Sequence, residues 1–379
     1  MKFTIKKNYF LEGVTQVARV ISPTPVFQIL KGIKVELTKE KMTLKASDSL
    51  VSVEYEIKAK NDKEQIIEVI EEGESVFPSK NFIDIIRKFP SNEIQIESLN
   101  KKINIKSENI EFNIQGYEEG EYPEFPEINK ENKIILETKL LNSLIKETIF
   151  CTASNNQRPI LEGVNFKLNK RILDALATDS YRLSKRREIL KDIEKEKSFN
   201  IIIPKKALQY VQRIIEQKSG FVEIFYENNR ILFIFENIKY SVLLINGNYP
   251  NTDSILKKEY ENLIEIDSKN FYDAIDRVSL INKDEKNDVI KLNIRNDNMK
   301  VHSSSKELGT AEEEVFCEGK LNTEEIKINL SAKYLKEAIQ AINSEKIKIK
   351  CSGPLSSFEM EPADNKKDII QILLPIRTY

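Results

Sequence analysis

Two stretches of this sequence decide its fold: residues 29–37 read ILKGIKVEL and residues 160–168 read ILEGVNFKL. The two stretches are 131 positions apart. The tetrapeptides ASDS at 46–49 and ATDS at 177–180 have the same separation. Matches that recur at one spacing indicate an internal repeat, which has to be recognised before the individual elements are assigned. The first part of the chain therefore holds two copies of one domain.

The predicted helices extend the repeat to a third copy. GEYP from Gly120 matches GNYP from Gly247 at nearly the same separation. Stretches with apolar residues at i, i+1 and i+4 recur about every 130 positions, starting at Phe10, Leu140 and Phe271 and, between them, at Phe82, Ala207 and Tyr334. We predict that Ser79, Ser268 and Ser331 are N-caps and that Pro204 lies in a first helical turn.

The segments between these helices alternate polar and apolar residues with period two, as in KINIK at 102–106 and KIKIK at 346–350. This alternation is typical of strands with one buried face. Each half-domain is predicted to be a strand, a helix and two or three antiparallel strands. The fold class is therefore α+β, with three similar domains at 1–125, 130–255 and 260–379, each of two helices packed on antiparallel sheets.

The composition restricts the class of protein. The 379 residues include 59 Lys and Arg against 60 Asp and Glu, and 40% are hydrophobic, which is enough to build a core in each domain. Charged residues interrupt every apolar run before it reaches the roughly 20 residues that cross a bilayer. The start MKFTIKKNYF lacks the apolar stretch of a signal peptide. We expect a soluble cytoplasmic protein with no membrane partner.

Cysteine and histidine are scarce. Cys151, Cys317 and Cys351 are odd in number and form no CxxC pair, so we predict buried reduced thiols, with no disulfide and no zinc site. The single histidine, His302, is predicted to be a polar surface residue. A catalytic mechanism that uses histidine would have to depend on that residue alone.

Two aspartates recur in the repeat, and paired carboxylates can hold magnesium in nucleases. Asp48 and Asp179 occupy equivalent positions, whereas the third copy reads HSSSKE without an aspartate. We therefore predict that both aspartates are hydrogen-bonding turn residues. The sequence also has no GxxxxGK[ST] loop for ATP. We predict no catalytic residues, no metal site and no cofactor.

The chain resembles the bacterial DNA polymerase III beta subunit family, the sliding clamps, along its whole length. The motifs are the MKFTIKK start, RPILEGVNF at 158–166, ATDSYRLSKR at 177–186, GNYPNTDSIL at 247–256 and LLPIRTY at 373–379. The resemblance implies a clamp fold whose two chains join head to tail into a ring around duplex DNA. It implies a non-catalytic, nucleoid-associated processivity factor that tethers the replicative polymerase and repair factors and is placed on DNA by a separate clamp loader.

The charge on the predicted helices is consistent with DNA binding. The six helical segments together carry about +8, while the whole chain carries −1. A basic layer of this kind contacts phosphates without reading sequence, and its binding depends on salt. The candidate DNA-facing residues are Lys6, Lys7, Arg19, Lys80, Arg87, Lys88, Lys139, Lys146, Lys205, Lys206 and Arg213, with Arg158 added from the resemblance.

The resemblance also implies a hydrophobic cleft that receives short peptides from client proteins. The matching positions are Leu161, Thr178, Ser180, Tyr181, Arg182, Leu183, Pro250, Ile255, Leu373, Leu374, Pro375, Ile376 and Arg377. Leu161 and Leu183 fit equally well as core strand positions. The apolar end of the chain is predicted to be docked rather than frayed.

Ring closure would bring the first domain of one chain to the third domain of another. The positions that match the family interface are Lys80, Lys102, Phe112, Ile114, Leu280, Ile281, Glu307, Glu312 and Glu313. One alternative is a repeat scaffold that binds DNA without encircling it, or that binds only proteins. A sequence-specific DNA binder would need base-reading side chains on one exposed helix, and no such helix stands out.

Overall fold

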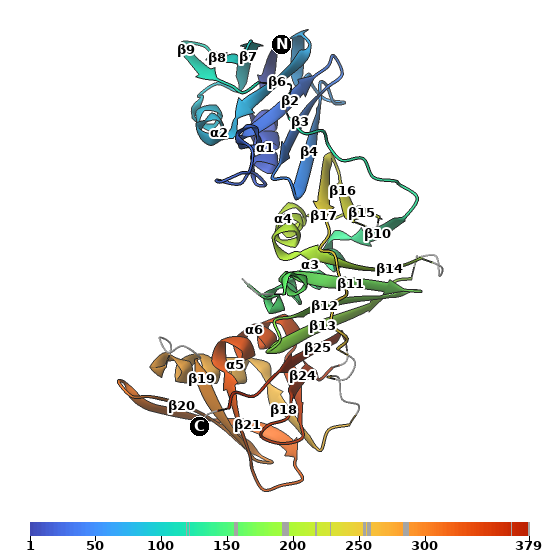
Figure 1. The fold of residues 1–379 in the computed structure, drawn as a ribbon. Helices are drawn as coiled ribbons and strands as arrows, with labels where there is room; N and C mark the ends of the chain where they lie inside the picture. The colour runs from blue at the N-terminus through green and yellow to red at the C-terminus, as the bar shows by residue number, and fades with distance from the viewer. Residues whose placement is uncertain are drawn as a thin grey trace. The chain divides into compact units, whose positions relative to one another are not determined.

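The computed structural model in Figure 1 describes residues 1–118, 120, 122–154, 158–191, 197–216, 218–227, 229–252, 255, 259–282, 288–364 and 366–377. The chain forms two compact units. The first is Met1–Leu141 with Gln209–Leu244, and the second is Asn142–Leu208 with Ile245–Tyr379. In the described part of the chain, no helix is long and apolar enough to cross a membrane.

The first unit holds two antiparallel sheets. A five-stranded sheet has the order β5-β1-β7-β8-β9, and an eight-stranded sheet has the order β10-β15-β16-β17-β4-β3-β2-β6. The strands are β1 (Lys2–Lys6), β2 (Gly32–Leu37), β3 (Lys41–Ser47), β4 (Val51–Lys58), β5 (Ile67–Glu71), β6 (Gly73–Pro78), β7 (Glu93–Leu99), β8 (Lys102–Ser107), β9 (Ile110–Gln115), β10 (Lys133–Glu137), β15 (Phe221–Tyr226), β16 (Arg230–Phe235) and β17 (Ile238–Leu243).

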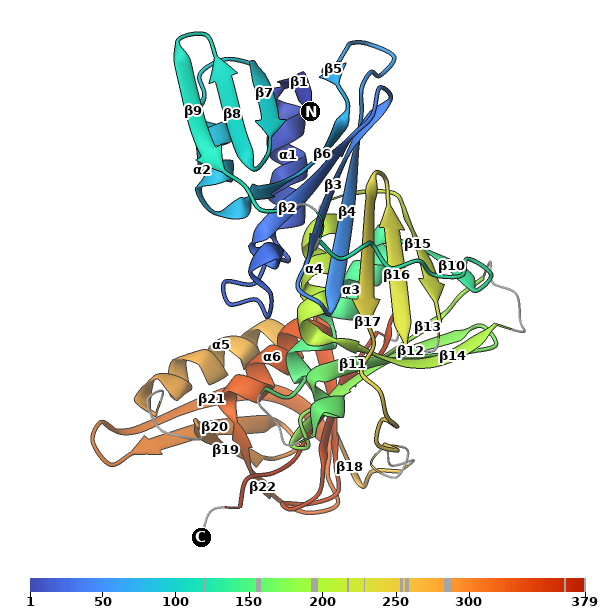
Figure 2. The same ribbon diagram turned by 45° about the horizontal axis from the view of Figure 1, so that its top comes forward.

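Two of the helices that pack on the sheets of the first unit are close to its N-terminal strands. Helix α1 (Lys7–Ala18) packs on β3 and β4 and on α2 (Ser79–Lys88), and Figure 2 shows β9 as the outermost strand beside them. Phe10 and Phe82 meet edge to face, with ring centres 5.8 Å apart, and both side chains are fully buried. Aromatic pairs in this arrangement add stabilisation to that of their buried area. A short 3-10 helix, η1 (Gln28–Lys31), precedes β2.

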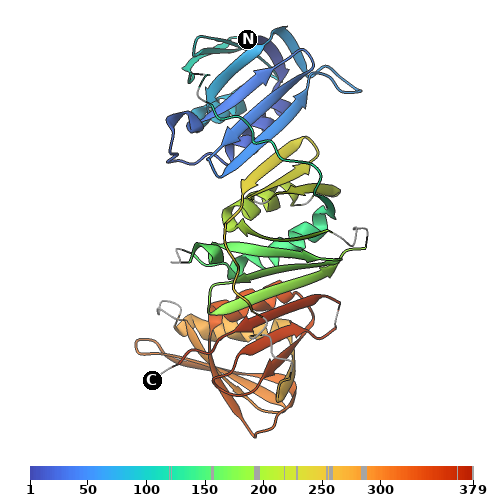
Figure 3. The same cartoon turned by 45° about the vertical axis from the view of Figure 1, so that its right-hand side comes forward.

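The second unit contains one antiparallel sheet with the order β14-β11-β12-β13-β25-β24-β23-β18-β21-β20-β19-β22. In Figure 3 the green strands β11 to β13 continue into the red strands β24 and β25. The strands are β11 (Gly163–Asn169), β12 (Ile172–Thr178), β13 (Arg182–Ile189), β14 (Ser198–Pro204), β18 (Asn262–Asp267), β19 (Val289–Ile294), β20 (Asn298–Ser305), β21 (Gly309–Lys320), β22 (Ile326–Ser331), β23 (Lys346–Cys351), β24 (Phe358–Pro362) and β25 (Asp368–Leu373).

The remaining helices are α3 (Thr138–Lys146), α4 (Lys205–Ile215), α5 (Ser268–Val278) and α6 (Ala332–Ile342), and η5 (Ser279–Ile281) follows α5. Helices α5 and α6 lie side by side and bury their apolar faces in one cluster with the inner residues of β18 to β24. The left-handed conformation of Asn343 ends α6, as is common at helix C-termini. This packing fixes the outward face of α6, which carries its polar side chains.

The order strand, helix, antiparallel strands predicted for each half-domain is confirmed; β10, α3 and β11 to β13 are one example. Ser331 is confirmed as an N-cap, because its hydroxyl accepts a hydrogen bond from the Tyr334 amide at 3.3 Å. The other cap predictions are wrong. The carboxylate of Asp267 caps α5 and makes Ser268 the first helical residue, while Pro204 is the last residue of β14.

The second wrong N-cap is Ser79. Its hydroxyl donates to the Lys31 carbonyl at 2.7 Å and is not used on the helix. Lys80 has extended backbone angles, and Asn81 has φ of 66°, so a kink separates Ser79 from the regular part of α2. The three cysteines are buried free thiols, as predicted. Burial raises the pKa of Cys317 and of Cys351 to about 11, so both thiols are protonated at neutral pH.

Candidate functional site

The site begins at a tight turn between β12 and β13. Asp179 Oδ1 accepts hydrogen bonds from the amides of Tyr181 and Arg182, both at 3.0 Å, and Ser180 has φ of 78°. The turn leaves the Tyr181 side chain 66% exposed. Asp48 makes the same two bonds in the first repeat, so both aspartates are turn residues, as predicted. One carboxylate oxygen of each aspartate therefore accepts hydrogen bonds from the backbone of its turn.

The C-terminal segment crosses beside this turn. After β25, the Leu374 amide donates to the Tyr181 carbonyl at 2.9 Å, and the Ile376 amide donates to the Asn329 carbonyl at 2.8 Å. Backbone bonds to the turn at Tyr181 and to β22 hold residues 374–376, so this part of the C-terminal segment is docked, as predicted. Residues 378 and 379, the last two of the motif LLPIRTY, lie outside the described residues.

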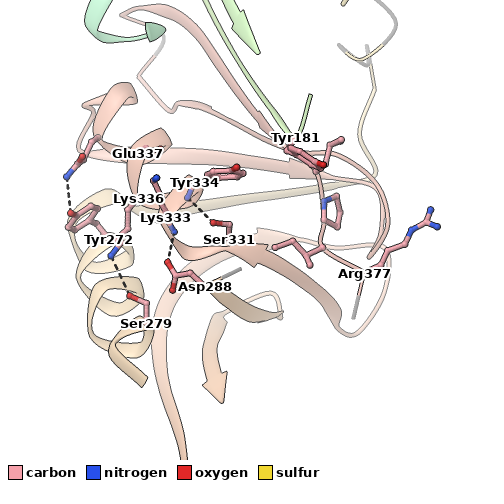
Figure 4. Close-up of a pocket in the computed structure, with 14 residues that line it drawn as sticks. Tyr181, Tyr272, Ser279, Asp288, Ser331, Lys333, Tyr334, Lys336, Glu337 and Arg377 are labelled. Atoms are coloured by element: carbon pink, nitrogen blue, oxygen red, sulfur yellow. Dashed lines mark hydrogen bonds between the residues drawn. The ribbon is translucent and has the colours of Figure 1, made fainter. Parts of the chain in front are cut away.

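These elements enclose a pocket of about 1010 Å³ in the second unit. Tyr181 lies on one side of it and Tyr272 of α5 on the other (Figure 4). The side chains that line it are Tyr181, Tyr272, Ser279, Asp288, Ser331, Lys333, Tyr334, Lys336, Glu337, Gln340, Leu374, Pro375, Ile376 and Arg377. The wall from the C-terminal segment is largely apolar, and the wall from α5 and α6 carries the hydrogen-bonding groups.

Hydrogen bonds fix the polar wall. Lys336 Nζ donates to Asp276 Oδ1 at 2.9 Å, and Gln340 Nε2 donates to the Tyr272 hydroxyl at 2.9 Å (Figure 4 shows the second bond). Asp288 Oδ2 accepts from the Lys333 amide at 3.1 Å, while its Oδ1 is buried with no partner among the described residues. Burial raises the pKa of Asp288.

Arg182 supports the pocket from below and does not face it. Its side chain is 8% exposed, and its guanidinium donates to Asp179, to Glu337 and to the Phe150 carbonyl. It also lies over the ring of Tyr334, 4.0 Å from the centre. Three of the five N–H groups of Arg182 are thus engaged inside the protein, and a hydrogen bond from Arg182 to a bound peptide stays a prediction. Arg182 fixes two pocket residues of α6.

The pocket brings together Tyr181 and the four residues 374–377 of the predicted cleft. Leu161, Leu183 and Leu373 are buried core side chains, each no more than 2% exposed. Thr178 is buried and donates to the Arg182 carbonyl at 2.6 Å. Outside the pocket lie the exposed Ser180, the half-buried Pro250 and Ile255, which is 40% exposed. A role in peptide contact for these seven residues stays a prediction, as it does for Arg182.

The candidate DNA-facing residues belong to four helices and their flanks. Seven of them are exposed, namely Lys80, Lys88, Lys139, Lys146, Arg158, Lys206 and Arg213, and Lys205 is half-buried. Arg87 is held in an ion pair with Asp84 at 2.7 Å. The side chain of Arg19 is half-buried, and its Nη1 has no hydrogen-bond partner among the described residues.

Two lysines of this set are engaged elsewhere. Lys6 is the last residue of β1 and not part of the predicted helix, and it forms an ion pair with Glu64. Lys7 Nζ donates to the Phe89 carbonyl at 2.6 Å. Both side chains would have to give up these bonds to contact DNA, so they are weaker candidates than Lys88 or Arg213.

Comparison with known proteins identifies the family. Models of the DNA polymerase III beta subunit match residues 1–126 with its N-terminal domain, 135–251 with its central domain and 253–377 with its C-terminal domain. The beta sliding clamps of Staphylococcus epidermidis and Staphylococcus aureus are 36% and 35% identical over 381 residues, and the matches cover each chain completely. The chain belongs to the DNA polymerase III beta subunit family.

A solved structure agrees. The DNA polymerase sliding clamp from Bacillus subtilis is 32% identical, has a TM-score of 0.95 and covers both chains completely. Sliding clamps are non-enzymatic processivity factors of the replicative DNA polymerase, and that is the function of this chain. The three-domain α+β clamp fold is confirmed, and a dimeric ring is consistent with the family. The exact domain boundaries stay predictions.

The residues expected at the ring interface belong to α2, β8, β9, η5, β21 and the turn before β21. In the first unit, Lys102 and Lys80 are exposed, Ile114 is half-buried, and Phe112 is 39% exposed and packs on Phe89 at 5.6 Å. Phe112 and Ile114 lie on β9, the edge strand of the five-stranded sheet.

In the second unit, Leu280 is 61% exposed and Ile281 is half-buried, both in η5. Glu307 is exposed. Glu312 pairs with Lys300 at 3.2 Å, and Glu313 pairs with Arg277 at 2.6 Å. An ion pair with Lys80 or Lys102 of another chain would compete with these bonds.

Sequence reasoning missed the polar wall of the pocket and one apolar residue near the expected interface. Lys333, Glu337 and Gln340 recur at helical spacing opposite the apolar face of α6, and this pattern was available in the sequence. Phe316 on β21 is 71% exposed, which is unusual for phenylalanine.

Within the described residues, no group of three or more His, Cys, Asp or Glu side chains could hold a metal ion.

Proposed function

We propose that this clamp holds its client proteins through short peptide segments bound in the pocket between Tyr181, the segment 374–377 and α6. The observation that supports this is the pairing of two unlike walls, one apolar and one hydrogen-bonding. Pockets of this type bind with apolar side chains and orient with a few polar groups. Tyr181 and Leu374 are exposed at the mouth, 66% and 45%, and would be covered by the peptide.

The replicative polymerase and the clamp loader are the clients that we assign to this pocket. A single pocket shared by both would make their binding mutually exclusive on one protomer. The polar wall would add specificity, because Lys333 and Gln340 line the pocket and are exposed. Clients would differ in affinity mainly through their dissociation rates.

We further propose that DNA binding is independent of sequence and depends on a closed ring of two chains. The exposed lysines and arginines of α3 and α4 supply charge for phosphate contacts, which position a protein without reading bases. Such contacts are weak and salt-dependent, so they permit sliding. Retention would come from encirclement. The edge strand β9 and the exposed Leu280 are the surfaces that we assign to ring closure.

The experiment is retention of labelled protein on nicked circular DNA, loaded with clamp loader and ATP, before and after the circle is linearised. We expect retention on the circle at high salt and its loss after linearisation. Equal retention on both forms would contradict encirclement and favour a DNA-binding scaffold. A second arm adds the polymerase catalytic subunit to the full-length chain and to a Leu374→Asp variant. Unchanged binding to that variant would contradict the peptide pocket.

A further inference from the structure

The first unit has a pocket of its own, of about 610 Å³, which the function described so far does not use. Its floor is apolar: Ile29 and Leu30 are 9% and 1% exposed and pack with Val76 and Tyr122. Its rim is also apolar, since Phe27 at the rim is 63% exposed. A pocket of this size with an apolar floor is suited to one or two apolar side chains of a ligand.

The walls of this pocket are held in place without a ligand. The Tyr122 hydroxyl lies within hydrogen-bond distance of the Gly32 and Lys45 carbonyls, at 3.2 and 3.3 Å, which ties the wall formed by Pro123 and Glu124 to the sheet. Glu124 also pairs with the buried Lys34 at 3.3 Å. A preformed wall lowers the ordering cost of binding.

One charged group in the wall has no counter-ion. Arg230, at the start of β16, lines the pocket, and its Nη1 donates to the buried Ser241 hydroxyl at 3.4 Å. No carboxylate of the described residues lies within ion-pair distance of its guanidinium. A half-buried arginine in this position favours a ligand carboxylate, which can accept two of its N–H groups.

The pocket occupies the repeat position of the cleft predicted from the resemblance. At the repeat separation of 131 residues, Leu30 corresponds to Leu161 and Ser47 to Thr178. The backbone repeats as well, because Leu243 N donates to the Leu50 carbonyl at 2.8 Å, as Leu374 N does to the Tyr181 carbonyl. The chemistry differs: Leu50 replaces Tyr181, and this pocket has two charged lining residues, Arg230 and the Glu124 that pairs with Lys34.

We propose that this first-unit pocket is a second binding site, for a short extended peptide that carries two apolar side chains followed by a carboxylate. The apolar side chains occupy the floor over Ile29 and Leu30, and the carboxylate pairs with Arg230. A peptide fits better than a compact small molecule, because the exposed apolar rim at Phe27 extends the surface beyond the pocket. The site is separate from the pocket at Tyr181 and can be occupied whether or not that pocket is.

The test uses the full-length protein and a fluorescein-labelled peptide Gly-Ser-Leu-Phe-Asp amide, titrated by fluorescence polarisation. A second peptide has Lys in place of Asp. We expect Arg230→Glu to weaken binding of the Asp peptide at least tenfold and to strengthen binding of the Lys peptide. Phe27→Ser should weaken both peptides at least fivefold. Phe221→Ser is the matched control, since Phe221 is 64% exposed on the same unit, and Arg171→Glu controls for the charge change.

A Leu374→Asp variant separates the two sites. If the Asp peptide loses affinity for Leu374→Asp but not for Phe27→Ser or Arg230→Glu, the peptide binds the pocket at Tyr181 and the inference is overturned. If no variant changes its affinity, or if the Asp peptide does not bind the native protein, the inference is likewise overturned. Tighter binding of the Lys peptide to Arg230→Glu would show that this variant is folded, because a misfolded variant would gain affinity for neither peptide.

Discussion

The guanidinium carbon of Arg182 lies 4.0 Å from the centre of the Tyr334 ring. Arg182 begins β13 and Tyr334 lies on α6, so the contact joins two segments that are far apart in the sequence. The same guanidinium bonds Asp179 in the turn below Tyr181 and Glu337 one turn further along α6. One buried side chain therefore sets the spacing between the turn and the helix that together form the pocket.

Replacing Arg182 should destabilise the protein and weaken the pocket. We expect Arg182→Ala to lower the free energy of unfolding by about 3 kcal/mol, because removal of one partner leaves a buried carboxylate unpaired. Arg187→Ala is the control: Arg187 pairs with Asp174 but its side chain is 38% exposed, and the loss should be under about 1 kcal/mol. Urea unfolding at fixed protein concentration measures the unfolding free energy of both variants. Equal losses of unfolding free energy in Arg182→Ala and Arg187→Ala would contradict the role assigned to Arg182.

Removing residues 374–379 should abolish binding of the polymerase catalytic subunit and leave the dimer intact. The deletion takes away the apolar wall of the pocket, whereas the surfaces assigned to ring closure are β9 and η5. Surface plasmon resonance measures binding, and sedimentation velocity measures the assembly. Leu355→Asp is a control for the milder Leu374→Asp, since both leucines are exposed in the second unit. If the truncated protein no longer forms a dimer, residues 374–379 contribute to the dimer interface, and the prediction is contradicted.

The repeat explains why so much of the fold was predictable. The first two copies keep the turn at Asp48 or Asp179, and all three keep the apolar faces of their helices. These local patterns fix the elements. The pocket was predictable only in part. Tyr181 and Leu374 lie in recognisable motifs, while Tyr272 and Gln340 reach the pocket because α5 packs on α6. Packing between distant segments leaves no short signal in one sequence.

The burial of Arg182 and the position of the α5 N-cap differ from the sequence-based expectation for a similar reason. Arg182 resembles a surface arginine in the sequence, yet the fold surrounds it with Phe150, Tyr334 and two carboxylates. The N-cap at Ser268 was misplaced by one residue because both Asp267 and Ser268 are good capping residues. A choice between two adjacent capping residues depends on the backbone angles, which the sequence does not specify.

Charge reversal on α4 should impair DNA loading. We expect Lys205→Glu, Lys206→Glu and Arg213→Glu together to reduce the amount of clamp loaded on nicked circles at least tenfold and to flatten its salt dependence, because fewer counter-ions are released. Affinity for the polymerase subunit should not change. Glu substitutions at Lys327, Lys346 and Lys366, which are exposed outside the helices, provide a matched change in net charge. Equal loading of the α4 variant and the native chain would remove α4 from the DNA-facing surface.

Acid should remove a stabilising contribution at Glu36. Burial alone would raise the pKa of Glu36, but hydrogen bonds from Lys45 and Lys34 outweigh it, so the pKa lies below its ordinary value of 4.5. A depressed carboxyl pKa stabilises the folded state above the unfolded pKa, and this stabilisation is lost as the pH falls through the folded pKa.

Glu36→Gln should therefore cost about 1 kcal/mol of unfolding free energy at pH 7 and progressively less below about pH 4. Urea titrations of both proteins across this range measure the difference. Glu324→Gln, at an exposed carboxyl before β22, should show little difference at either pH. A cost for Glu36→Gln that stays constant down to pH 3 would show that packing, and not ionisation, is responsible.

Apolar contacts should dominate ring closure. We expect Phe112→Asp and Leu280→Asp each to raise the dimer dissociation constant at least tenfold, because each puts a charge where an apolar surface would be buried. Glu313→Ala should have a small effect, since Arg277 already holds that carboxylate. Ile172→Asp is the control for Phe112→Asp, because both side chains are 39% exposed. Sedimentation equilibrium measures the constants, and circular dichroism checks that each variant is folded. If Ile172→Asp dissociates the dimer as strongly as Phe112→Asp, or if Phe112→Asp has no effect, then β9 is not the interface strand.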